Sequence, residues 1–430
     1  MSARGVQRRV SAMLFTVMLA WTLPALAQTA DSTLPPSLRP YYDTLLEEGE
    51  WGAVLNLQRL GLEAIDQGHL PIAERAFDSA LERIELIYAD SDSARKARSL
   101  WAAEGSKDFK GEPYERAMTY YYRGLLFMVQ GDYENARASF RSAEYQDTIS
   151  GDETYAGDFG LMSLLSGWAS TCADDPGMAA DFYQRAGTQQ PQGLDAPAPD
   201  RNTLVLVESG TAPVKTATGS YGEALQLRRG DNPFVSASLG DQPLALLGDL
   251  GWQASTLGGR QVDVILGGKA SFRQGSETVA DIGLQGATMA IGLDDGGGAA
   301  GALAVVGIAA VLISSASKPK ADVRYWDNLP DRIYGTFLKD DVQALAIAEH
   351  TSDGERYPLA APVIDHTAGA CRLLLYRTRQ PGTLRPQAVS NLSASERKSL
   401  HKRNQARDLA FRDDMQRRLL SADETLAGGE

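Results

Sequence analysis

The chain has few residues of the types that do chemistry in a recognisable spacing. None of its histidines belongs to a His-Glu-x-x-His pair that would hold zinc, and none adjoins a cysteine. Gly267-Gly268-Lys269 is followed by Ala270, so the hydroxyl with which a phosphate loop holds magnesium is missing. Asp294-Asp295-Gly296 lacks the alternating carboxylates of a calcium loop. We therefore expect no catalytic residue, no metal site and no cofactor. The histidines are His69, His350, His366 and His401.

The two cysteines, Cys172 and Cys371, allow two interpretations. In an oxidising compartment they could form a disulfide that joins the two halves of the chain. Free cysteine is also among the most buried residue types, so each could be a separate thiol in a core. Two cysteines so far apart carry little pairing information, and we favour the separate thiols.

The N-terminus has the features of a secretory signal peptide, residues 1–27. A region with three arginines precedes an apolar run from Met13 to Leu23, and Ala25-Leu26-Ala27 then forms a small-residue cleavage pattern. An uncleaved anchor is the alternative, but the run is too short to cross about 30 Å of hydrocarbon. No cysteine follows Ala27, so the usual lipid attachment point is absent. The prediction is an exported, periplasmic protein that could be held peripherally at a membrane.

The composition excludes two classes of protein. The formal net charge is −13, and removal of the leader takes away three further arginines. Such an acidic chain is not expected to bind nucleic acid, because contacts with phosphate dominate that affinity. Apolar residues make up 43% of the chain, which is not a disordered composition.

A small-residue and aromatic pattern recurs three times in the first half. The second copy reads AMTYYYRGLLFMVQGDYENARASFRSA, and aromatics stand at matching offsets in the others. This pattern resembles the tetratricopeptide repeat family over roughly residues 40–193, which implies a solenoid of helical hairpins. The copies begin at Val54, Ala117 and Gly160, and their key residues are Gly61, Phe77, Gly124, Phe140, Gly167 and Tyr183.

In that family the first helix of each hairpin lines a groove. The groove positions here are apolar and aromatic, which suits a peptide-like or protein partner. The other interpretation, to which we give slightly more weight, is that the chain fills its own groove, and the proline-rich Thr33 to Pro40 is one candidate occupant. The predicted partner-binding residues are Leu62, Ile65, Tyr121, Leu125, Met128 and Trp168.

A linker at residues 194–202 introduces a mainly β domain, residues 203–390. Strands are expected at 203–208, 262–266, 278–282, 344–348, 362–364 and 372–377, where short apolar runs alternate with glycine and proline. The apolar stretch Gly296 to Ser317 is either a buried small-residue helix, which we favour, or a membrane span.

The segment 391–430 is charged and helix-favouring. We expect it to dock on the body through one apolar stripe, formed by Leu400, Leu409, Phe411, Met415 and Leu419.

The order of parts is also similar to a family of uncharacterised bacterial exported proteins and lipoproteins. The matching pieces are YYYRGLLFMVQGDYENARASFR, LVLVESGTAPVK and ADVRYWDNLPDRI. This resemblance implies no reaction or cofactor. We interpret Tyr325, Trp326, Leu329 and Pro330 as a structural corner.

These observations predict an α+β fold in which a helical repeat domain precedes a mainly β domain. The function predicted is a periplasmic scaffold or adaptor of the bacterial cell envelope. One alternative is a structural component held in the membrane through residues 296–317. Another is an envelope enzyme with a site in the β domain, since distant carboxylates leave no motif.

Overall fold

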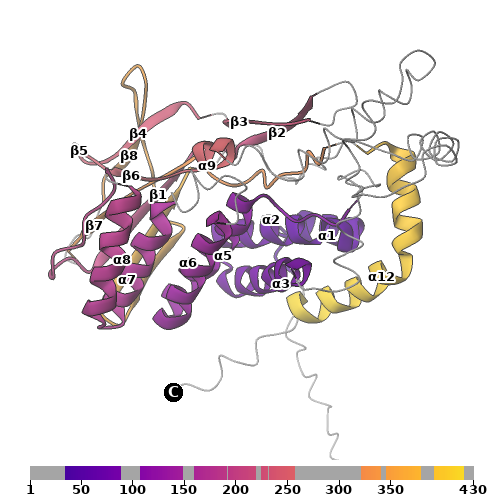
Figure 1. Ribbon diagram of the computed structural model, residues 1–430, viewed down its shortest axis with the longest axis horizontal. Helices are drawn as coiled ribbons and strands as arrows, with labels where there is room; N and C mark the ends of the chain where they lie inside the picture. The colour runs from indigo at the N-terminus through magenta and orange to yellow at the C-terminus, as the bar shows by residue number, and fades with distance from the viewer. Residues whose placement is uncertain are drawn as a thin grey trace, which may run out of the picture.

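The computed structural model describes residues 34–88, 107–148, 159–190, 192–218, 224–230, 232–256, 321–339, 345–378 and 392–420. Within these ranges helices form the first part of the chain and strands the second, so the predicted α+β class is confirmed (Figure 1). The expected leader, the strands at 262–266 and 278–282, and the stretch 296–317 lie outside the described residues. None of the described helices is long and apolar enough to cross a membrane.

The first part of the chain is built from helical hairpins. In the described residues, α1 (Arg39–Glu48) and the short 3-10 helix η1 (Gly49–Gly52) precede three of them. The three hairpins consist of α2 (Ala53–Asp66) with α3 (Leu70–Tyr88), α5 (Pro113–Gln130) with α6 (Tyr133–Thr148), and α7 (Gly160–Cys172) with α8 (Pro176–Gln189). Successive hairpins stack through α3 with α5 and α6 with α7. The hairpins coincide with the three repeat copies read from the sequence.

Each hairpin closes where a glycine on its first helix meets an aromatic ring on its second. A Cβ added to Gly124 would lie 2.4 Å from the ring of Phe140, closer than real side-chain carbons approach. The close-packed interior leaves no room to relax such a contact cheaply. The same spacing recurs in all three hairpins, as Gly61 with Phe77, Gly124 with Phe140 and Gly167 with Tyr183.

Gly124→Ala is therefore expected to destabilise the protein by about 1–3 kcal/mol, the usual cost of overpacking a core. Gly187 is the matched control, because it is also helical and nothing lies within 4 Å of a Cβ built there. Alanine at position 187 should be neutral or stabilise by up to about 1 kcal/mol, since helical glycine is unfavourable. Urea unfolding of both variants tests this, and equal stability would contradict the close approach.

The second part of the chain forms three sheets in the described residues. The order of the largest is β10 (Ile364–Ala368), β11 (Cys371–Arg377), β1 (Thr203–Ser209), β7 (Arg332–Leu338) and β6 (Ala245–Asp249). β1 is parallel to β11, and the other pairs are antiparallel. The second sheet runs β5 (Gln242–Pro243), β4 (Phe234–Leu239), β8 (Ile347–Thr351) and β9 (Arg356–Pro358). A separate hairpin pairs β2 (Val214–Thr218) with β3 (Ala224–Arg228), and the short helix α9 (Leu250–Thr256) follows β6.

The central strand β1 is buried on both faces because its alternate residues face different layers. Leu204 and Leu206 belong to the core shared with the helices, whereas Val205 and Val207 belong to a second core shared with the four-stranded sheet. The described chain thus has three layers: helices, the five-stranded sheet and the four-stranded sheet. The predicted strands at 203–208 and 372–377 are confirmed as β1 and β11. Those at 344–348 and 362–364 overlap only the first residues of β8 and β10.

Candidate functional site

The six residues predicted to bind a partner are all buried. Their exposed fractions are 0% for Leu62, Ile65, Tyr121 and Leu125, 1% for Trp168 and 4% for Met128. They lie on the first helices of the hairpins, but this inner face packs against the chain's own residues. The ring of Trp168, for example, lies 5.0 Å from that of Phe337 on β7. In the described residues this face is closed, which agrees with the interpretation that the chain fills its own groove. The assignment of these residues to a partner stays a prediction, and it now requires the inner face to open.

Residues 321–331, which we call the crossing segment, contact the inner helices α2 and α5. The ring of Trp326 lies 5.8 Å from that of Tyr122 and 6.2 Å from that of Phe77. Arg59 donates a 2.6 Å hydrogen bond to Asp327, and both charges form an ion pair. The interpretation of self-occupancy is therefore supported for residues 321–331. In the other predicted occupant, residues 33–40, Leu34 and Leu38 are also buried in the core of the helices. The crossing segment leads directly into β7, consistent with the predicted corner.

Glu115 joins three elements through one buried carboxylate. It lies at the start of α5 with an exposed fraction of 0%. Its Oε2 accepts hydrogen bonds from Lys215 Nζ on β2, at 2.8 Å, and from the backbone N–H of Glu112, at 2.6 Å. Its Oε1 accepts the backbone N–H of Trp326 at 2.7 Å. Burial alone would lower the pKa of Lys215, but Glu112 and Glu115 together raise it above its usual range.

A second buried charge cluster lies between α5, α2 and the end of β1. Tyr122 donates a 2.8 Å hydrogen bond to Glu208, and Arg377 Nε lies 2.6 Å from the same carboxylate oxygen. Arg377 also donates to Asp66 of α2 at 2.7 Å. Burial opposes the charge of Arg377, yet Asp66, Tyr122 and Glu208 raise its pKa. This cluster fastens the sheet to the helices, since each ion needs its partner inside the protein.

Glu349 lies between the two larger sheets and has no cationic partner among the described residues. Its exposed fraction is 0%, and Thr378 donates a 2.6 Å hydrogen bond to its Oε1. Burial raises the pKa of this carboxyl above its ordinary value, and the nearby hydroxyl groups of Ser209 and Thr378 oppose that rise only in part. Relative to the unfolded chain, folding therefore shifts Glu349 toward its protonated form.

Glu349→Gln is expected to stabilise the protein more at alkaline than at acidic pH. Because the pKa of Glu349 is raised on folding, the unfolded carboxyl ionises first as pH increases. Stability is then lost between the ordinary pKa, near 4.5, and the raised one. Glutamine keeps an acceptor for Thr378 and carries no charge. Thermal unfolding as a function of pH should show a gain for Glu349→Gln that grows with pH, and none for the exposed Glu47→Gln. A gain that does not change with pH would contradict this.

The cysteines form a disulfide, so the preference for two separate thiols is wrong. Cys172 ends α7 and Cys371 begins β11, and their Cα atoms lie 5.7 Å apart although 199 residues separate them in the chain. Only the docking of the third hairpin against the sheet brings them together. The bond therefore ties the helical part to the strands at this point.

The C-terminal helix α12 (Ala394–Leu420) docks on α1, η1 and α3, as predicted. Leu400, Phe411, Met415 and Leu419 are buried, whereas Leu409 is 55% exposed and does not belong to the predicted stripe. Leu409 lies two residues before Phe411, and on a helix that spacing points to a different face.

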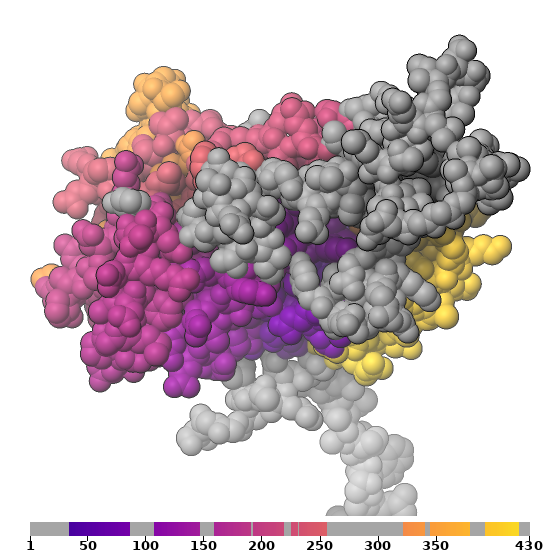
Figure 2. All heavy atoms as spheres, viewed as in Figure 1, coloured from indigo at the N-terminus to yellow at the C-terminus, as the bar shows by residue number. Residues whose placement is uncertain are grey.

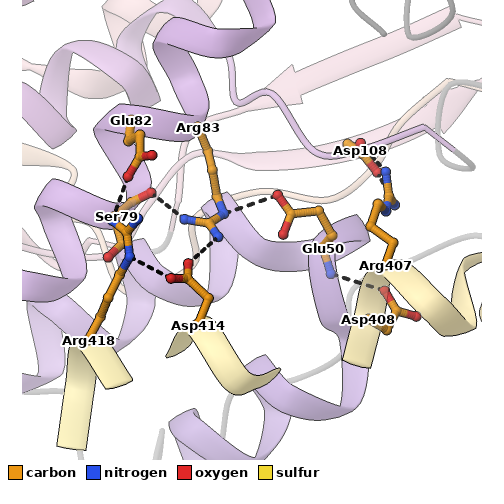
Figure 3. A network of polar contacts seen from close by, with 9 residues as sticks. All are labelled: Glu50, Ser79, Glu82, Arg83, Asp108, Arg407, Asp408, Asp414 and Arg418. Carbon is orange, nitrogen blue, oxygen red and sulfur yellow. Dashed lines mark hydrogen bonds and ion pairs between the residues drawn. The ribbon is translucent and has the colours of Figure 1, made fainter. Parts of the chain in front are cut away.

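Ion pairs surround this apolar contact (Figure 3). Arg83 of α3 donates to Glu50 at 3.1 Å and to Asp414 at 3.4 Å, and Arg418 donates to Glu82 at 2.5 Å. Nearer the middle of α12, Arg407 binds Asp108 through two hydrogen bonds of 2.8 and 2.9 Å. These contacts hold α12 against the N-terminal end of the helical array, formed by α1, η1 and α3.

An open cleft of about 470 Å³ lies on the outer side of the array, between α6 and α8. At its base Glu144, which is nearly buried, accepts from Arg185 at 2.7 Å and from Gln189 at 2.9 Å. Arg141 is exposed on the wall and has no acidic partner among the described residues. The cleft thus presents a free cation beside the 64% exposed ring of Tyr145. Sequence reasoning missed it, because it looked for a site on the inner helices only.

The pair most like a nucleophile and base is Ser238 and His350, whose Oγ and Nε2 atoms lie 2.7 Å apart. Ser238 also donates its hydroxyl proton to the carbonyl oxygen of Gly240 at 2.9 Å. With that proton engaged, the imidazole N–H is the donor in the contact with Ser238. The pair therefore joins β4 to β8 as a structural contact.

Across the described residues, no group of three or more histidine, cysteine, aspartate or glutamate side chains is arranged to hold a metal ion. Comparison with family models, with curated proteins and with solved structures finds no match to this chain.

Proposed function

We propose that this chain is an exported scaffold protein of the bacterial cell envelope, built on tetratricopeptide-type hairpins. The periodic glycine–aromatic contacts support the hairpin family, because they occur where that repeat requires small residues. The leader pattern supports export. A body held together by buried ion pairs and a disulfide suits a rigid support.

The outer cleft is the surface that we assign to a partner, and its free cation is the observation that carries the proposal. The inner face is closed by the chain's own residues, so a partner can reach the outer helices without any rearrangement. Arg141 provides a charge for a carboxylate, and Tyr145 provides a rigid amphipathic surface of the kind enriched at interfaces. The partner that fits is an acidic, peptide-like segment of another envelope protein.

The proposal is tested by affinity capture from intact envelopes with Arg141→Glu as bait, beside the wild type. Arg356→Glu on the exposed strand β9 is the control, since it makes the same charge change on a strand instead of on α6. We expect a specific set of acidic proteins to be lost from Arg141→Glu and retained by Arg356→Glu. Identical sets in all three captures would refute the cleft.

Location is tested separately by fractionation and N-terminal sequencing. We expect the mature chain in the periplasmic or envelope fraction, beginning at Gln28 after cleavage behind Ala27. A full-length chain in the cytoplasm would refute export, whatever the capture experiment shows.

A further inference from the structure

The cations of α12 fall into two groups along the helix. In the second half, Arg407 and Arg418 pair with acidic residues of the body. In the first half, four cations lie within two turns and form no ion pair with any described residue. Arg397, Lys398, Lys402 and Arg403 are all exposed. We call these four residues the basic turns.

The basic turns contrast with the rest of the molecule. The whole chain has a net charge of −13, although these four cations are already included in it. A negatively charged surface would therefore be repelled by most of the protein and attracted at this place. Such an uneven field orients a protein as it approaches a charged partner.

The position of α12 suits a broad partner rather than a small one. The helix lies at one end of the molecule, opposite α7 and α8 (Figure 1), and part of it is visible at the surface in Figure 2. The outer cleft and a small cavity beside α7 are lined by other elements, whereas the basic turns lie on the exposed surface of a helix. An exposed helix surface with several cations that form no ion pair with the described residues can contact an extended array of negative charges.

We propose that the basic turns bind the surface of a bilayer that carries anionic lipids. This inference rests on the proposed location in the envelope, where such a surface is within reach. Clusters of lysine and arginine beside an anionic bilayer each contribute attraction that falls off within a Debye length. The docked half of α12 holds the basic turns in place, so the body need not change shape on binding.

The test uses the purified mature chain and co-sedimentation with vesicles of phosphatidylglycerol and phosphatidylethanolamine, or of phosphatidylcholine alone. Binding is expected to the anionic vesicles only and to fall as salt is raised. Lys398→Gln/Lys402→Gln should weaken binding about 25-fold, at roughly fivefold for each cation. Arg228→Gln/Arg356→Gln removes two exposed cations from the strands instead and should bind as the wild type does.

Equal binding to phosphatidylcholine, or equal binding by the two double variants, would overturn the proposal. Capture of polyglutamate by the basic turns, with no binding to anionic vesicles, would also overturn it and point to an acidic protein. Circular dichroism shows whether α12 remains helical in both variants. Because the vesicles are added to purified protein, failure here leaves the fractionation result on export unaffected.

Discussion

Glu115→Gln is expected to lower the free energy of unfolding by about 3 kcal/mol, as in other proteins where one partner of a buried ion pair is removed. Glu115 is fully buried and lies 2.8 Å from Lys215, which is itself only 2% exposed. Among the described residues, the variant leaves this ammonium with Glu112, at 3.2 Å, as its ion-pair partner. Urea unfolding followed by circular dichroism measures the loss.

Glu134→Gln is the matched control, because Glu134 also lies in the first turn of a helix but is exposed. It should change stability by less than about 0.5 kcal/mol. The double variant Glu115→Gln/Lys215→Met should recover part of the loss, since removing both members of a buried pair is often nearly neutral. A single variant as stable as the wild type would show that Glu115 does not carry this junction.

Removal of the Cys172–Cys371 disulfide is expected to cost about 3–5 kcal/mol. The bond closes a loop of 199 residues, and long loops lose most entropy when they are closed in the unfolded chain. Cys172→Ser/Cys371→Ser should therefore unfold at a lower urea concentration than the oxidised wild type.

Dithiothreitol provides the control for this second prediction. It should lower the stability of the wild type to that of the double serine variant and leave the variant itself unchanged. Two free thiols in the native protein, detected by alkylation without reductant, would contradict the bond.

The inner surface could be assigned to the correct helices from the sequence, but its occupant could not. Tyr121 and Trp168 stand at positions that the hairpin pattern turns inward, and they do face inward. The residues that cover this face come from the crossing segment and β7, far along the chain. The sequence pattern is the same whether a partner or the chain's own sheet covers these apolar residues, because both remove the same apolar surface from water.

Local spacing accounts for what could be predicted. Gly124 and Phe140 stand at the distance that one helical hairpin requires. Residues 204–207 are apolar without interruption because β1 is buried on both faces. These features depend on helix and strand periodicity, which acts between residues near one another in the chain. The charged, helix-favouring composition likewise predicted α12.

Long-range pairing was decided by the tertiary structure alone. Cys172 and Cys371 form a disulfide because the third helical hairpin packs against the five-stranded sheet. Glu115 contacts both Lys215 and the crossing segment because segments far apart in the chain pack against the start of α5. No periodic signal connects such residues, so their separation in the chain carries no information about contact. In the described part of the chain, the two cysteines and the buried Glu115 therefore connect the helices to the segments that follow them. Arg141 at the outer cleft and the four cations of the basic turns could be identified only from the structure, because the sequence does not show which cations form ion pairs.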